Sequence, residues 1–169
     1  MRILIALSLL WGMQLAAQDM QSCPMHKGHM KEQHQADVKK HGDEAMGFPH
    51  DATTHHFRLV PDGGTIEVTV NDAKDVDDLA AIRMHLKHIV MMFSNGDFSI
   101  PMFVHSRTPP GVTEMEEKRS AIVYSFEELP DGGKVRIKTM DHDALNAIHD
   151  FLNFQIEDHH TGDKTDQFR

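Results

Sequence analysis

The chain has 169 residues, with 17 Lys and Arg against 26 Asp and Glu and a formal net charge of −9. This length allows one domain with appendages and excludes a two-domain enzyme. The negative charge argues against a nucleic-acid partner, because binding to a phosphate backbone depends on clustered Lys and Arg. A single Cys cannot form an internal disulfide, whereas 14 His and 12 Met supply many nitrogen and sulfur donors.

Residues 1–17 have the composition of a secretory signal peptide. Arg2 gives a positive start, an apolar stretch follows, and Leu15-Ala16-Ala17 supplies small residues for cleavage before Gln18. The apolar stretch of about 14 residues is shorter than the roughly 20 that a membrane-spanning helix needs. We therefore expect cleavage, no membrane span in the mature chain, and a periplasmic or secreted protein.

Residues 18–47 combine metal-donor side chains with almost no branched aliphatic residues. Such a composition does not build a core, so we expect a disordered His- and Met-rich tail that binds metal. Five potential donors fall close together in this tail: Cys23, Met25, His26, His29 and Met30. Thiolate and thioether groups select Cu(I), and imidazole serves Cu, Zn or Ni. The tail is therefore predicted to bind copper.

The string Cys23-Pro24-Met25-His26 resembles the short heavy-metal-binding motif near the N-termini of copper and silver efflux proteins and metal-pumping ATPases. In that family Pro usually follows, where this chain has Lys27, so the ligand chemistry is carried over but the fold of the module is not. The resemblance implies copper capture and a metal efflux or delivery partner. The alternative is a linker whose donors bind metal only adventitiously.

Residues 48–163 are predicted to form one folded domain made of two similar units, followed by a C-terminal tail over 164–169. The string Pro61-Asp62-Gly63-Gly64 recurs 69 positions later as Pro130-Asp131-Gly132-Gly133. Each copy lies between segments in which apolar and polar residues alternate, which is typical of a β-hairpin. The domain is therefore expected to contain a duplicated hairpin.

A helix is predicted after each hairpin, over residues 76–94 in the first unit and 143–157 in the second. Their apolar stripes align with a shift of 66 positions. The order ββα-ββα predicts an α+β fold, with an antiparallel sheet of four or five strands and two helices on one face. Residues 100–104 are the candidate fifth strand, at the edge, and residues 112–119 are expected to hold a short helix.

A second group of candidate metal ligands lies in the folded domain. His85, His88 and Met92 fall on one flank of the first predicted helix, because positions i, i+3 and i+7 share a side. His55 is expected to face the helices from its strand, and His105 is a further candidate on the connector. These residues predict a metal site in the domain. The alternative for each histidine is a partly buried ring that hydrogen-bonds to the backbone.

Two other functions remain open for the domain. A non-covalently bound haem would use one His and one Met as axial ligands, taken from His85, His88, Met92 and Met102. A metal-independent interaction domain, such as a homodimer, would use an exposed face that carries Met84 and Met91. The common nucleophile, phosphate-binding and zinc-protease motifs are absent from the sequence, so an enzyme is the least supported class, and this question stays open.

Several strings of the folded part resemble a family of small uncharacterised bacterial proteins. They are Ala-Thr-Thr-His-His-Phe at 52–57, His-Leu-x-His-Ile at 85–89, Pro-Met-Phe-Val-His at 101–105 and Phe-Gln-Ile-x-Asp-His at 154–159. The resemblance covers residues 46–163. Some members carry the label aspartate carbamoyltransferase, which the sequence does not support, because that activity needs an Arg/Ser/Thr-rich phosphate site and two lobes. The resemblance therefore implies membership of this family but no particular reaction.

Overall fold

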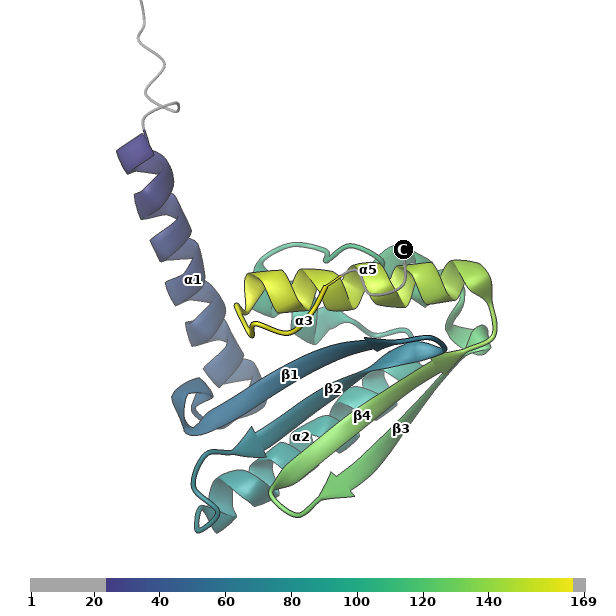
Figure 1. Ribbon diagram of the computed structural model, residues 1–169, viewed down its shortest axis with the longest axis horizontal. Coiled ribbons are helices and arrows are strands. Elements are labelled where there is room, and N and C mark those ends of the chain that lie inside the picture. The colour runs from purple at the N-terminus through teal and green to yellow at the C-terminus, as the bar shows by residue number, and fades with distance from the viewer. Residues whose placement is uncertain (1–23, 166–169) are drawn as a thin grey trace, which may run out of the picture.

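Two ββα units build the folded domain, and a long N-terminal helix stands beside them (Figure 1). The computed structural model describes the backbone of residues 24–165 and the side chains of residues 28–165. The predicted signal peptide, Cys23 and residues 166–169 lie outside this part. The elements are, in chain order, α1 (Pro24–Met46), η2 (His50–Ala52), β1 (Thr53–Val60), β2 (Gly63–Val70), α2 (Val76–Ser94), α3 (Ser99–His105), α4 (Val112–Glu117), η3 (Arg119–Ala121), β3 (Ile122–Leu129), β4 (Gly132–Thr139) and α5 (His142–Asp158).

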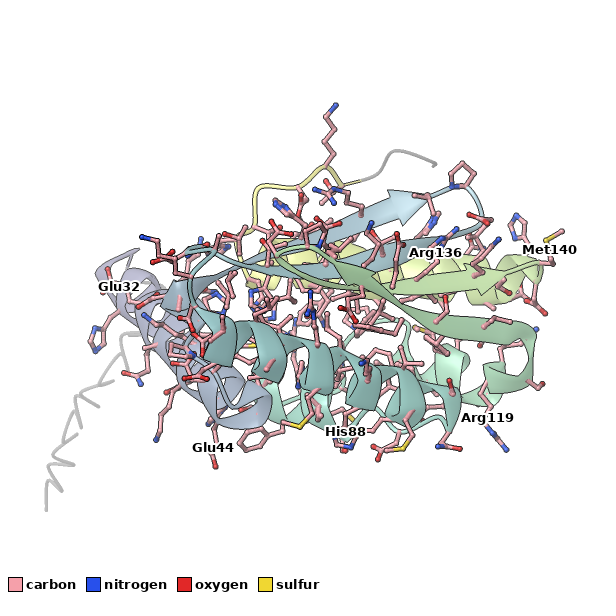
Figure 2. The ribbon with its side chains drawn as sticks, turned by 90° about the horizontal axis from the view of Figure 1, so that it is seen from below. Glu32, Glu44, His88, Arg119, Arg136 and Met140 are labelled. Carbon is pink, nitrogen blue, oxygen red and sulfur yellow. The ribbon has the colours of Figure 1, made fainter. Side chains whose placement is uncertain are left out.

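The strands form one antiparallel sheet in the order β1-β2-β4-β3. The inner strands β2 and β4 meet with Ile66 opposite Val135, which are equivalent positions in the two units. An approximate twofold axis therefore passes between these two residues. Alternate residues of β2 and β4 are buried under the helices. The opposite face is charged, and Arg136 lies there, on the side of the sheet away from α2 (Figure 2).

Glycines allow the two hairpins to approach each other closely. A Cβ atom at Gly63 would lie 2.1 Å from the carbonyl oxygen of Ile137, and one at Gly132 would lie 1.9 Å from that of Val68. These two contacts are equivalent under the sequence repeat, so the structure confirms the duplicated unit. The repeated glycines are needed because no side chain fits between β2 and β4.

Helices α2 and α5 cover the same face of the sheet, and each packs mainly on the hairpin of the other unit. Leu86 of α2 lies over Gly133 of β4, and Leu152 of α5 lies over Gly64 of β2. Both glycines lie on the covered face of the sheet, because each stands two positions before a buried residue of its strand, Ile66 or Val135. The predicted α+β fold with two helices on one face is therefore confirmed.

The connector between the units is a helix, where the sequence suggested an edge strand over residues 100–104. Helix α3 buries Pro101, Val104 and His105, whose spacing fits a helix and not an alternating strand. Pro101 is tolerated because it lies in the first turn, where backbone N–H groups have no partner within the helix. The sheet thus has four strands within the described residues, and the predicted fifth strand is wrong. The short helix predicted over 112–119 is present as α4.

Residues 24–46 form helix α1, so the prediction of a disordered tail is wrong for this segment. The helix has no apolar stripe and docks through a few contacts, mainly with α3. Val38 is 4% exposed, and the His41 ring lies 4.8 Å from that of Phe103. Lys, Glu, Gln, Ala and Met, which favour helix, dominate its composition. None of the described helices is long and apolar enough to cross a membrane.

We expect Gly132→Ala to lower the free energy of unfolding by about 2–3 kcal/mol, because the new methyl group would overlap the Val68 carbonyl. Urea denaturation measures this change. Gly28→Ala is the matched control, since no atom lies within 4 Å of its new Cβ. The control should leave stability unchanged or raise it by up to about 1 kcal/mol. Wild-type stability in Gly132→Ala would contradict the tight contact between β2 and β4.

Candidate metal centre

A cavity of about 90 Å³ lies between α2, α3, α5 and the C-terminal end of α1. Most of its walls are apolar, with Phe57, Val68, Leu86, Phe93 and Phe151 among the lining residues. Four histidines and one methionine interrupt this apolar lining: Met46, His55, His85, His105 and His159. The cavity exceeds the roughly 10–15 Å³ that one water molecule needs. It can therefore hold an ion or a very small ligand.

Met46 and His55 bring a thioether and an imidazole together at this cavity. The Met46 Sδ atom lies 3.3 Å from the His55 Nε2 atom. Two donors bound to one ion at about 2.0 and 2.3 Å, with an angle near 100°, are separated by about 3.3 Å. The other ring nitrogen of His55, Nδ1, is buried and has no hydrogen-bond partner among the described residues. The observed spacing therefore suits a shared ion as well as the present hydrogen bond between the ring and the sulfur.

The backbone between α1 and β1 places these two side chains. Gly47 has a φ of 77°, which turns the chain sharply after Met46 at the end of α1. The Asp43 carboxylate accepts the backbone N–H of His50 at 2.6 Å and so stabilises this turn. In β1, His55 lies opposite Val68 of β2 and shares a strand face with Phe57. His55 therefore points to the helices, as the sequence predicted.

Further imidazole rings continue from His55 towards α5. The His50 ring stacks on His55 with centroids 4.9 Å apart, and it lies 6.0 Å from the His159 ring. His159 lies 5.0 Å from His105 of α3. On the other side, Phe48 stacks on His55 at 6.5 Å and meets His85 edge to face at 5.8 Å. The histidines thus form one continuous cluster along the cavity.

Burial keeps three of these rings neutral at pH 7. Burial, helped by the charges of neighbouring histidines, lowers the pKa of His55 from 6.5 to about 3. The same causes lower the pKa of His159 to about 3 and that of His85 to about 4. A neutral imidazole retains the lone pair that binds a metal ion. Protons therefore do not compete with a metal for these rings near neutral pH.

Asp158 anchors the end of the cluster that lies farthest from β1. Its carboxylate accepts hydrogen bonds from His105 Nδ1 at 2.6 Å and from His34 Nε2 at 2.9 Å. Burial raises the pKa of Asp158, but the hydrogen bonds and charges of these two histidines outweigh burial and hold it below its ordinary value. His105 Nε2 also lies 3.0 Å from Gln155 Oε1. Both ring nitrogens of His105 are thus engaged, so this predicted ligand has a structural role here.

The residues predicted to converge on one flank of α2 separate in the structure. His85 lines the cavity. His88 is exposed and projects from α2 away from the sheet (Figure 2). Met92 is 9% exposed and packs in the core. The wheel positions of these residues lie close together, but a helix half embedded in the core directs them to three different environments.

The ligands predicted in the N-terminal segment lie at the opposite end of α1 from the cavity. Met25 and His26 belong to the first turns of α1, and Cys23 precedes the described part. His29 and Met30 are exposed on the helix. At about 1.5 Å per residue, Met30 is roughly 24 Å from Met46 along the axis. One metal ion cannot bind both groups while α1 remains helical.

Three donors of the cluster were not predicted from the sequence: Met46, His50 and His159. A signal existed for His159, because this residue, directly after α5, is equivalent to Phe93 at the end of α2. A polar residue at the end of an apolar stripe could have been noticed there. Met46 and His50 had no such signal, since their positions depend on the docking of α1.

Two aromatic residues, one from each unit, occupy the positions equivalent to His55 and His159. Tyr124 of β3 is equivalent to His55, and it packs edge to face on Phe93 of α2, with ring centroids 5.8 Å apart. Burial raises the pKa of Tyr124, so this hydroxyl stays neutral. The fold therefore accepts aromatic residues at these positions and does not require His55 or His159 there.

No three His, Cys, Asp or Glu side chains are arranged as a metal site within residues 28–165. The pair at the cavity includes a Met, which is a donor outside those four types. Comparisons with protein-family models, with curated proteins and with solved structures found no match, so the family resemblance stays a prediction.

We expect Asp158→Asn to loosen α1, because it weakens the hydrogen bonds from His34 and His105. Unfolding free energy should fall by about 2–4 kcal/mol, because two hydrogen bonds to a carboxylate are replaced by weaker contacts with an amide. Amide hydrogen exchange around Val38 should become at least about tenfold faster. Glu157→Gln, at an exposed neighbouring position, is the control and should change neither quantity. Unchanged protection of α1 in Asp158→Asn would show that the carboxylate does not hold the helix.

We expect His159→Phe to flatten the dependence of stability on pH in chelator-treated protein. Between about pH 6 and pH 4, His159 is protonated in the unfolded chain, whose pKa for this group is 6.5. In the folded protein it stays neutral until about pH 3, so stability falls as the pH falls through this range. This effect is about 1.4 kcal/mol per pH unit for one histidine. The variant carries the residue found at the equivalent position of α2 and removes this contribution. Urea denaturation at several pH values measures the slope, and an equal slope in both proteins would refute a buried neutral His159.

Proposed function

We propose that the protein binds copper ions in the periplasm and acts in copper resistance, buffering or delivery. The observation that carries this proposal is the pair Met46 and His55, whose donor atoms lie 3.3 Å apart at a cavity lined by neutral imidazoles. Thioether and imidazole donors together favour copper over the hard ions that prefer oxygen ligands. The apolar remainder of the lining keeps water out and favours Cu(I).

Met46 Sδ and His55 Nε2 would supply the first two ligands of the ion. His85 and His159 line the same cavity and offer further nitrogen donors. His50 stacks on His55 and would hold that ring in place. The residues present thus match the chemistry of a copper ion.

The exposed donors at the start of α1 would act separately from the cavity. His29 and Met30 are accessible, and Cys23, Met25 and His26 lie next to them in the sequence. This end of α1 would capture copper from solution or exchange it with an efflux or delivery partner. Because roughly 24 Å of α1 separate this end from the cavity, copper would be captured at one site and stored at another.

Haem is a weaker alternative for the domain. The cavity of about 90 Å³ is far below the roughly 300–1,000 Å³ of pockets that enclose larger organic ligands. Of the four candidate axial ligands, only His85 lines it. A copper ion therefore suits the cavity better than a macrocycle.

Cavity substitutions test the proposed function in a Cys23→Ser, His26→Ala background, which removes two donors of the N-terminal string. We expect His55→Ala and Met46→Leu each to weaken Cu(I) binding by at least about tenfold, because each removes a ligand atom. Competition with a chromophoric Cu(I) chelator measures the affinity, and circular dichroism confirms that each variant is folded. His142→Ala, at an exposed position of α5, is the control. Parent affinity in both cavity variants would exclude the cavity as the copper site.

A further inference from the structure

The outer surface of α2 presents two methionines and one histidine to solvent. Met84 is 72% exposed, Met91 is 56% exposed, and His88 lies exposed between them. No hydrogen bond holds the His88 ring to another of the described residues, and the ring projects away from the sheet (Figure 2). These side chains therefore make no contribution to the core.

Helical geometry brings these three side chains to one side of α2. At 100° per residue, they fall within about 60° of one another around the axis. Met84 lies about 6 Å before His88 and Met91 about 4.5 Å after it along the axis. Methionine side chains are long and flexible, so both thioethers can reach an ion bound to the imidazole between them.

The fold itself does not demand these residues. The equivalent positions of α5 are Asp150, Phe154 and Glu157, none of which is Met or His.

We propose that Met84, His88 and Met91 form a second, solvent-exposed site that binds a soft monovalent cation, Cu(I) or Ag(I). Two thioethers and one imidazole make a neutral, soft donor set, which selects such ions over Zn(II) or Ca(II). The outer site shares α2 with the cavity, since His85 lies one turn from His88 on the buried side. It uses none of the cavity ligands and stands independently of the proposed function.

A hydrophobic contact with another protein is the competing explanation for exposed methionines. Substitution by Leu separates the two cases, because Leu keeps the apolar surface but removes the sulfur donor. A contact surface would tolerate Met84→Leu and Met91→Leu, whereas an ion site would not.

Methyl NMR of the full chain, labelled with ¹³C at the methionine methyl groups, tests the outer site by titration with silver nitrate. We expect the Met84 and Met91 methyl signals to shift together and to saturate with the same affinity. Met140, which is 98% exposed, is the internal reference and should not respond in the same range. We expect Met84→Leu or His88→Ala to weaken the response of the Met91 methyl by at least about tenfold, and Met140→Leu to leave it unchanged.

The proposal is overturned if the Met84 and Met91 methyls shift no more than that of Met140, or if His88→Ala and Met84→Leu leave the Met91 response intact. The cavity variants His55→Ala and Met46→Leu should not change the Met91 response. Loss of the cavity site and loss of the outer site are therefore separate results, because each methyl group reports its own position.

Discussion

The half-buried carboxylate of Asp158 determines how the parts of the candidate site come together. It accepts hydrogen bonds from His34 of α1 and His105 of α3, while it belongs to α5 itself. Helix α1 has no apolar stripe, so it depends on such specific contacts to dock. Once it is docked, its last residue, Met46, lies against His55 of β1. An electrostatic contact at one end of the cavity thus supports the pair of donors at the other.

The candidate site occurs once among the described residues, although the fold that carries it is duplicated. The two units share their hairpin turns, their central glycines and their helix stripes, and the twofold relation between β2 and β4 preserves the same backbone contacts. At the equivalent positions, one helix-sheet contact pairs Tyr124 with Phe93, whereas the other brings His55 and His159 to the cavity. Each pair combines one residue from each unit, because each helix packs on the hairpin of the other unit. The polar residues at one of the two contacts therefore mark the candidate site.

Patterns local to the chain predicted most of the domain. Alternation and the Pro-Asp-Gly-Gly turns gave the hairpins, and the apolar stripes gave α2 and α5, because these elements bury one regular face. Residues 100–104 were misassigned since a short apolar run around Pro101 satisfies a buried helix as well as a strand. Helix α1 was missed although many of its residues favour helix, because it lacks an apolar stripe and docks through single contacts far apart in sequence. For the same reason Met46 could not be placed beside His55, whereas His85 and His55 were correctly directed to the interior.

The proposed copper function requires one ion held between Met46 and His55, and anomalous X-ray scattering from crystals of the protein grown with Ag(I) tests this most directly. The expected result is a silver peak within bonding distance of Met46 Sδ and His55 Nε2. A crystal with silver peaks on the surface and at the start of α1, but none in the cavity, would contradict it.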